Sequence, residues 1–406
     1  MKYIILLGDG MADEPIEALD GRTPLQAAKT INMDRLARQG TIGMAETVPP
    51  SFHPGSDVAN LSVFGYNPAT CYSGRSPLEA ASMGVELAPT DVAFRLNLVT
   101  LGVHCSDIYM QDFAAGHIST DEARLLIATL QQELGDDEFQ FYPGVSYRHL
   151  MVWRNGKDHF KIAPPHDLTN QSVRDQMLRG GDAEPLAQIT NSAQMLFRDH
   201  PVNRAREAAG KAPANSIWLW GQGRRPQMPT LNAMYGLSGA VISAVDLIRG
   251  IGVYAGLDVI LVPGATGYLD TNYRGKADAA LEALQTRDFV YLHVEAPDEA
   301  AHGGLLAEKI EAIERFDTEV VGTVLDGLGQ FGEYRVLLLP DHPTPVAKMT
   351  HTRDPVPFVL FGSGGEFPAN GADSYSEVTA GASGLKLDQG HLLMQALVQG
   401  ALPKVG

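Results

Sequence analysis

The stretch Tyr3-Ile4-Ile5-Leu6-Leu7-Gly8-Asp9-Gly10 introduces the pattern that decides the fold. Its apolar run predicts a buried β-strand, and the following Gly-Asp-Gly turns the chain and leaves a carboxylate at the strand end. In open α/β sheets, ligands bind beyond the carboxyl ends of the strands. Four more apolar runs predict buried parallel strands: Asp258–Val262, Phe289–Val294, Arg335–Leu339 and Pro357–Phe361. We therefore expect the residues that follow such strands to form the functional site.

Helix-length segments alternate with these strands, which predicts an α/β fold with a doubly wound, mostly parallel sheet. The predicted helices are Pro24–Gln39, Gly275–Gln285 and Leu305–Gly327. Within residues 91–234 the strands become longer and alternating, as in Val92–Val99 and Val145–Trp153. We interpret this region as a second α/β domain, inserted into a discontinuous first domain of residues 1–90 and 235–406.

The composition excludes several classes of partner. The 406 residues include 31 Lys and Arg against 48 Asp and Glu, a net charge of −17, which disfavours nucleic acid and anionic membranes. No apolar run reaches the roughly eighteen residues of a membrane span, and the first run is too short for a signal peptide. The two cysteines, Cys71 and Cys105, cannot form a disulfide framework. We expect a cytoplasmic protein with no membrane or nucleic-acid partner.

Acidic residues and histidines cluster after the predicted strands. The candidates are Asp9, then Asp298 and His302, then Asp341 and His342, with His351 nine residues further on. A lone aspartate in such a place is usually a helix cap or a turn former. Three aspartates with neighbouring histidines at strand ends are better explained as metal ligands. Carboxylate and imidazole donors suit Mn²⁺, Zn²⁺ or Mg²⁺.

A nucleophile candidate lies in Pro54-Gly55-Ser56-Asp57, a tight turn that leads into a helix-like stretch. A serine in this position is most often a helix N-cap. The start of a helix also favours anions, and a nearby metal would promote ionisation of the Ser56 hydroxyl. Beside a two-metal site, Ser56 is therefore the leading nucleophile for phosphoryl transfer.

Specific motifs along nearly the whole chain carry a family resemblance: Leu7–Asp13, Thr23–Leu25, Asn32–Ala37, Pro54–Asp57, Gly65–Pro68, Tyr72–Ala80, Val262–Gly267, Val294–His302 and Pro340–His342. Together they resemble the archaeal-type cofactor-independent (2,3-bisphosphoglycerate-independent) phosphoglycerate mutases of the alkaline phosphatase superfamily. The resemblance implies an alkaline-phosphatase-like core and interconversion of 3-phosphoglycerate and 2-phosphoglycerate through a phosphoserine at Ser56. It also implies two divalent metal ions and no 2,3-bisphosphoglycerate.

By the same resemblance, the ligands of one metal are Asp9, Ser56, Asp341 and His342, and those of the other are Asp298, His302 and His351. The inserted domain would close over a small phosphorylated metabolite. An anionic substrate calls for arginine clamps, and the candidates are His117, Arg148, Arg204, Arg224, Arg225 and Lys276. For each arginine, a solvated surface position is the alternative. The bacterial enzymes are longer and have Glu where this chain has Asp57.

Two other functions stay open at this stage. A branch of the family has been proposed to act as homoserine kinases, and Trp218–Gly223 and Glu295–Ala300 look like that branch. The sequence has no Gly-x-x-x-x-Gly-Lys-Ser/Thr nucleotide loop. A non-catalytic binding module is the third interpretation. The metal identity and the oligomeric state, a homo-oligomer included, also stay open.

Overall fold

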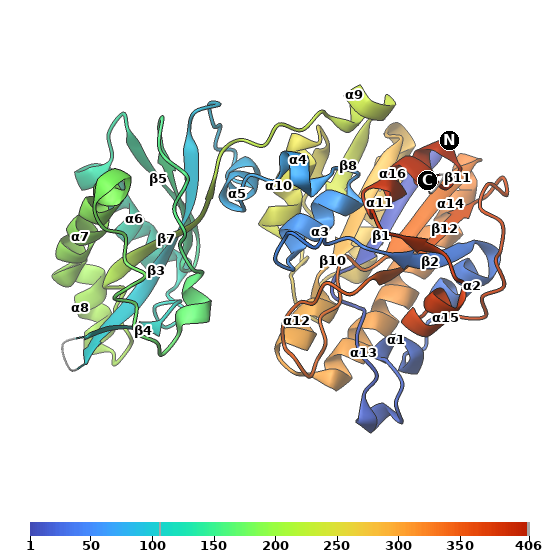
Figure 1. The fold of residues 1–406 in the computed structure, drawn as a ribbon, viewed down its shortest axis with the longest axis horizontal. Coiled ribbons are helices and arrows are strands. Elements are labelled where there is room, and N and C mark those ends of the chain that lie inside the picture. The colour runs from blue at the N-terminus through green and yellow to red at the C-terminus, as the bar shows by residue number, and fades with distance from the viewer. Residues whose placement is uncertain (105–106, 404–406) are drawn as a thin grey trace. The chain divides into compact units, whose positions relative to one another are not determined.

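The computed structural model describes residues 1–104 and 107–403, so Cys105 lies outside the described part. The chain forms two compact units, Met1–Tyr72 with Gln227–Gly406, and Ser73–Pro226 (Figure 1). The sequence pattern had placed the two crossings near residues 90 and 235. The second unit starts earlier because helix α5 (Ser76–Ser82) packs within it. The Ser76 hydroxyl donates to the Gly221 carbonyl across 2.6 Å and accepts from the Arg95 amide across 2.7 Å.

The first unit has an eight-stranded sheet in the order β13-β2-β12-β11-β1-β10-β8-β9. Its strands are β1 (Lys2–Gly8), β2 (Thr41–Ala45), β8 (Gly239–Ile242), β9 (Asp258–Ile260), β10 (Phe289–Val294), β11 (Tyr334–Leu339), β12 (Val356–Gly362) and β13 (Lys386–Leu387). β1 pairs in parallel with β10 and β11, and Leu7 aligns with both His293 and Leu339. The predicted α/β fold with a mostly parallel sheet is confirmed. The register brings the residues after all three strands to one edge.

The prediction that Pro357–Phe361 forms a parallel strand is wrong. This run lies in β12, which is antiparallel to both β11 and β2. Residues 340–355, between β11 and β12, contain no helix. A parallel return needs a long crossover, usually a helix, so this connection brings the chain back antiparallel. A buried apolar run does not by itself encode strand direction.

The first unit also contains helices, several of which pack against its sheet (Figure 1). They are α1 (Pro24–Ala27), α2 (Ile31–Gln39), α3 (Ser56–Val63), α4 (Pro68–Cys71), α9 (Leu231–Tyr235), α10 (Asp246–Tyr254), α11 (Tyr273–Thr286), α12 (Ala296–His302), α13 (Leu306–Arg315), α14 (Thr323–Leu328), α15 (Glu377–Ala382) and α16 (Leu392–Gln399). Alternate β1 residues Ile4 and Leu6 join the same core as Leu36 of α2 and Ala277 of α11. This alternation buries one sheet face under those helices.

Two predicted helices differ from the observed ones. Pro24–Gln39 is two helices, because buried Asp317 accepts the backbone N–H groups of Asn32 (3.2 Å) and Met33 (2.7 Å) and so starts α2 afresh. Leu305–Gly327 is nearly continuous, but a π-helical segment, Phe316–Gly322, lies between α13 and α14. The 3.6-residue periodicity of the sequence predicts neither the break between α1 and α2 nor the π-helical segment.

The second unit is an antiparallel sheet with helices packed on it. Its strands are β3 (Val92–His104), β4 (Asp107–Asp112), β5 (Phe139–Val145), β6 (Arg148–Trp153) and β7 (Ser216–Gly223), and its longer helices are α6 (Thr120–Leu134), α7 (Glu184–Arg198) and α8 (Pro201–Ala208). Phe94 and Leu96 of β3 share a core with Leu126 of α6 and Phe197 of α7. No helix within the described residues is long and apolar enough to cross a membrane.

Candidate active site

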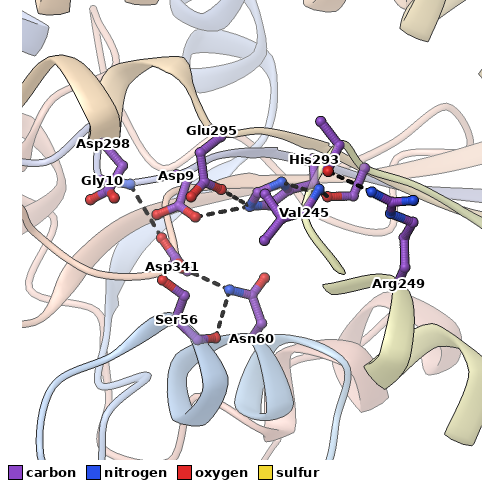
Figure 2. A network of polar contacts seen from close by, with 12 residues as sticks. Asp9, Gly10, Ser56, Asn60, Val245, Arg249, His293, Glu295, Asp298 and Asp341 are labelled. Carbon is purple, nitrogen blue, oxygen red and sulfur yellow. Dashed lines mark hydrogen bonds and ion pairs between the residues drawn. The ribbon is translucent and has the colours of Figure 1, made fainter. Parts of the chain in front are cut away.

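The carboxyl edge of the first unit's sheet gathers buried acidic side chains. Asp9 follows β1, Asp341 follows β11, and Asp298 lies on α12 just after β10; all three are almost fully buried. The Asp341 carboxylate is fixed on both sides. Its Oδ1 accepts from the Gly10 amide across 3.2 Å, and its Oδ2 accepts from the side-chain amide of Asn60 across 2.7 Å (Figure 2).

Ser56 is the first residue of α3, and its hydroxyl oxygen lies 3.1 Å from Nε2 of His342. Asn60 lies one turn later on the same helix. Besides holding Asp341, its side-chain amide donates to the Ser56 carbonyl across 2.9 Å, and its own oxygen accepts from the Tyr291 hydroxyl across 2.6 Å. Hydrogen bonds of Asn60 therefore connect the start of α3 directly to the acidic cluster.

The remaining predicted metal ligands surround Asp298. Its two carboxylate oxygens lie 3.2 Å from Nε2 of His302 and 3.5 Å from Nε2 of His351, and these two nitrogens are 2.8 Å apart. The Nδ1 atom of His302 is 2.9 Å from the Met349 carbonyl, so it carries the proton and leaves Nε2 free to bind a cation. The structure thus brings all seven residues of the predicted metal site together.

Burial and mutual repulsion perturb the acids of this cluster. Burial, followed by the charge of Asp341, raises the pKa of Asp9 well above its ordinary value. Burial alone would also raise the pKa of Asp298, but hydrogen bonds from His302 and His351 hold it well below the ordinary range. Burial lowers the pKa of His342 to about 4. Neutral imidazole and ionised carboxylate are the forms that bind metal ions.

The residues fit divalent cations. Asp9 Oδ1 is buried, has no hydrogen-bond partner within the described residues, and lies 3.6 Å from Nε2 of His342. Two sets have ligand atoms within 4.8 Å of one another: Asp9, Asp341 and His342, and Asp298, His342 and His351. Oxygen and imidazole donors suit Mn²⁺, Zn²⁺ or Mg²⁺. His342 lies within reach of both sets, whereas the family resemblance implied that it binds only one of the two metals.

The predicted substrate residues have different surroundings within the two units. Lys276 is buried in α11, where its ammonium donates to the His293 carbonyl across 3.1 Å. Arg204 pairs with Asp199 on an exposed part of the second unit. Arg224 is held by Asp158 across 2.8 Å and by backbone carbonyls, while Arg225 is exposed.

His117 and Arg148 do lie near each other in the second unit, because both contact Tyr147. The His117 ring is 6.1 Å from the Tyr147 ring, and the Arg148 guanidinium lies 5.7 Å from it. His117 is an exposed residue with a φ of 47°, in the left-handed region. Both side chains therefore remain candidates for an anion site.

The sequence analysis missed two arginines beside Arg148. Arg75 and Arg95 both contact Glu79, at 2.9 Å and 3.0 Å, and Arg95 lies 4.6 Å from the ring of Trp220. Burial opposes ionisation of Glu79, but the charges of Arg95, Arg75 and then Arg148 lower its pKa overall. For Arg95 the available signal was a charged residue within the apolar strand β3, whereas Arg75 lies just before α5. The same signal, a polar residue in an apolar strand, marks His293 in β10.

Comparison with known proteins gives the family. A family model described as 2,3-bisphosphoglycerate-independent phosphoglycerate mutase matches residues 37–203. A protein of Geobacter sulfurreducens, described as a probable enzyme of this name, is 59% identical over 98% of this chain and 100% of its own length. The chain belongs to the 2,3-bisphosphoglycerate-independent phosphoglycerate mutases. A mutase of Methanosarcina acetivorans is 54% identical over 95% of this chain and 97% of its own length.

Solved structures agree with this membership. A protein from Pyrococcus horikoshii has a TM-score of 0.83 and 30% identity, covering 100% of this chain and 99% of its own. A cofactor-independent phosphoglycerate mutase from Thermoplasma acidophilum has a TM-score of 0.67 and 27% identity, covering 98% and 99%. The family resemblance inferred from the motifs is confirmed, and the kinase alternative is not favoured by any of these mutase names.

Proposed function

We propose that this chain is a metal-dependent phosphoglycerate mutase. It interconverts 3-phosphoglycerate and 2-phosphoglycerate through a phosphoserine at Ser56 and needs no 2,3-bisphosphoglycerate. The observation that carries the proposal is the Ser56 hydroxyl, at the start of α3 and 3.1 Å from His342 within a cluster of carboxylates and imidazoles. We expect the enzyme to work in the cytoplasm.

The cluster divides into two cation sites. Asp9, Ser56, Asp341 and His342 would hold one ion, and Asp298, His302 and His351 would hold the other. We expect Mn²⁺, Zn²⁺ or Mg²⁺. When bound, these ions favour the ionised serine and neutralise the oxygens of the phosphoryl group.

The chain's own residues account for the transfer steps. Ser56 Oγ attacks the phosphorus of 3-phosphoglycerate in line, the bond from phosphorus to the 3-oxygen breaks, and that oxygen takes up a proton. The 2-hydroxyl of glycerate then loses its proton and attacks the phosphoserine, which releases Ser56 Oγ. Asn60 holds Ser56 and Asp341 in position through its side-chain amide. The backbone amides at the start of α3 favour the anionic phosphoryl group.

We propose that the second unit recognises the anionic metabolite. The residues that support this role are Arg75, Arg95 and Arg148 around the single carboxylate of Glu79, with His117 nearby. Glu79 contacts Arg75 and Arg95 directly, and the charge of Arg148 also acts on it. Guanidinium groups gathered in this way suit a carboxylate or phosphate group. Arg204 and Arg224 pair with other acids, Asp199 and Asp158, and are not part of this group.

The test is direct turnover by the full-length, Mn²⁺-loaded chain. We expect ³¹P NMR to show 2-phosphoglycerate forming from 3-phosphoglycerate without 2,3-bisphosphoglycerate, and to show no product with Ser56→Ala. A parallel sample receives ATP and homoserine instead. Absence of 2-phosphoglycerate in the metal-replete wild type would overturn the proposal, and phosphohomoserine formation would replace it with the kinase.

A further inference from the structure

Strand β7 forms an edge of the second unit's sheet. Among the described residues it pairs only with β3, and Asn97 of β3 lies opposite Trp218 of β7 (Figure 1). The next residue of β3, Leu98, donates its amide to the Tyr147 carbonyl, just before β6, across 3.0 Å. Successive residues of a strand turn their backbone groups to opposite sides, so Asn97 faces β7 and pairs there with Trp218.

The backbone groups of Ile217 and Leu219 consequently point away from β3, along the outer edge of β7. These residues are only 1% and 3% exposed. The Ile217 carbonyl accepts from the Ser216 hydroxyl across 3.1 Å. No hydrogen bond within the described chain reaches the Ile217 amide or either backbone group of Leu219. Native proteins pair nearly all buried backbone groups, so three groups at this edge lack the partner that burial demands.

A cavity of about 310 Å³ is lined by this edge of β7. Both faces of the strand are covered: Leu219 shares a core with Ile189 of α7, and Trp218 shares another with Leu168. The cavity opens along the edge, between these two layers. Its other lining residues include Ala187 and Thr190 of α7 on one side, and Ile162 and residues 176–179 on the other. The volume is at the lower end of the range found for ligand pockets.

The spacing of the unpaired groups indicates which ligand would pair with them. Ile217 and Leu219 are two residues apart on an extended strand, so their backbone groups repeat after about 6.8 Å. An extended peptide repeats its own N–H and C=O groups at the same interval and can bond to both residues. A ligand with a single amide reaches only one of them. The apolar surface of Ile162 and Trp218 suits apolar side chains on the peptide.

We propose that the outer edge of β7 binds a short free oligopeptide, which adds a strand to the sheet. The bound stretch is about three residues long, the span from Ile217 to Leu219. A second copy of this chain is a poorer occupant, because its own β7 edge lies between the same two layers and cannot enter a cavity of this volume. Every residue of the site belongs to the second unit. The site goes beyond the proposed function and does not depend on it.

The experiment follows amide hydrogen exchange, residue by residue, in the full-length chain by NMR. Without peptide, we expect the Leu219 amide to exchange faster than the Trp218 amide, which is bonded to β3. The probes are a panel of N-acetyl tripeptide amides with Val, Leu or Ile at the outer positions and Ala or Thr in the middle. At ten times its dissociation constant, a bound peptide is expected to slow exchange at Ile217 and Leu219 by about tenfold and to leave Trp218 unchanged.

Two controls separate strand addition from other binding. The same peptide methylated at every backbone nitrogen keeps its side chains but has no donors, so we expect it to give no protection. Ala187→Phe fills the cavity and is expected to abolish binding, whereas Met195→Phe, at a 79% exposed position of the same helix, is expected to bind as the wild type does. Circular dichroism verifies that both variants are folded, and the methylated peptide decides the question if Ala187→Phe is not.

Four results would overturn the proposal. They are slower exchange at Leu219 than at Trp218, no binding by any probe at about 1 mM, equal protection by the methylated peptide, and protection that grows with protein concentration in the absence of peptide. The last result would show that a second copy of the chain covers the edge. Mutase activity is measured separately by ³¹P NMR, so a chain that binds the peptide but converts no 3-phosphoglycerate would reject only the proposed function.

Discussion

The side-chain amide of Asn60 donates to Asp341 Oδ2 across 2.7 Å, and the same amide holds the Ser56 carbonyl across 2.9 Å. Asn60 therefore positions both the proposed nucleophile, Ser56, and a proposed metal ligand, Asp341. The Tyr291 hydroxyl, which donates to Asn60 Oδ1, fixes the orientation of this amide. Partners of this kind typically contribute about 10- to 100-fold to metal affinity or activity.

We accordingly expect Asn60→Ala to lower kcat by about 10- to 100-fold and to weaken Mn²⁺ binding, with little change in KM for 3-phosphoglycerate. Tyr291→Phe removes only the hydrogen bond that orients Asn60, so its loss should be smaller. Steady-state kinetics and Mn²⁺ titration measure both. Wild-type kcat and Mn²⁺ affinity in a folded Asn60→Ala protein would refute this positioning role.

Lys309 joins two loops that carry proposed metal ligands. Its buried ammonium donates to Asp13 Oδ2 and to the Thr344 carbonyl, each across 2.8 Å. Removing one partner of a buried ion pair leaves an uncompensated charge, so we expect Lys309→Met to lower the free energy of unfolding by about 3–5 kcal/mol. Adding Asp13→Asn removes that charge and should restore part of the loss. Urea unfolding measures both; equal stability of Lys309→Met and wild type would contradict the result expected.

The buried His149 in the second unit predicts a dependence of stability on pH. Burial lowers its pKa from 6.5 to about 3, and its Nδ1 accepts from the Gly144 amide across 3.0 Å. Between these two values the unfolded chain binds a proton that the folded chain excludes. The free energy of unfolding therefore falls as the pH drops below 6.5, by up to about 1.4 kcal/mol per pH unit from this residue.

We expect His149→Gln to flatten the pH dependence of unfolding between pH 6.5 and lower values while leaving the slope above pH 6.5 unchanged. Urea unfolding of both proteins, stripped of metal and measured at a series of pH values, isolates this contribution. Identical slopes in the two proteins would mean that His149 is protonated in the folded state.

The cluster around Glu79 makes a prediction about substrate binding. Arg148→Met and Arg75→Met should each raise KM for 3-phosphoglycerate by about 10- to 100-fold, the loss expected for a charge-assisted hydrogen bond. Arg124→Met is the matched control, because Arg124 is exposed on α6 and only pairs with Asp121 at 3.6 Å. If the control and Arg148→Met raise KM equally, the effect is one of net charge and the cluster is not the binding site.

The sequence allowed the candidate metal ligands to be proposed because parallel strands end at one edge. Asp9 and Asp341 follow neighbouring strands, so their proximity needs only the strand order. His293 and Asn60 lie inside a strand and a helix, where polar residues are easily assigned to the fold. Their contacts, with Asp9 and with Tyr291, join segments more than 200 residues apart.

Two other features could not be obtained from sequence patterns. The antiparallel direction of β12 depends on the connection before it, and apolar runs carry no direction. Which arginines bind the substrate stays a prediction, because Arg204 and Arg224 pair with Asp199 and Asp158 just as Arg75 and Arg95 pair with Glu79.

The central claim, that Ser56 carries the phosphoryl group, is tested most directly by trapping it. The Mn²⁺-loaded full chain is mixed with 3-phosphoglycerate, quenched in acid within milliseconds, digested and analysed by mass spectrometry. We expect a phosphorylated peptide spanning Ser56, labelled at that residue, in the wild type and no such peptide with Ser56→Ala. A wild type that forms 2-phosphoglycerate with phosphate on another residue, or in which Ser56→Ala still turns over, would contradict the account.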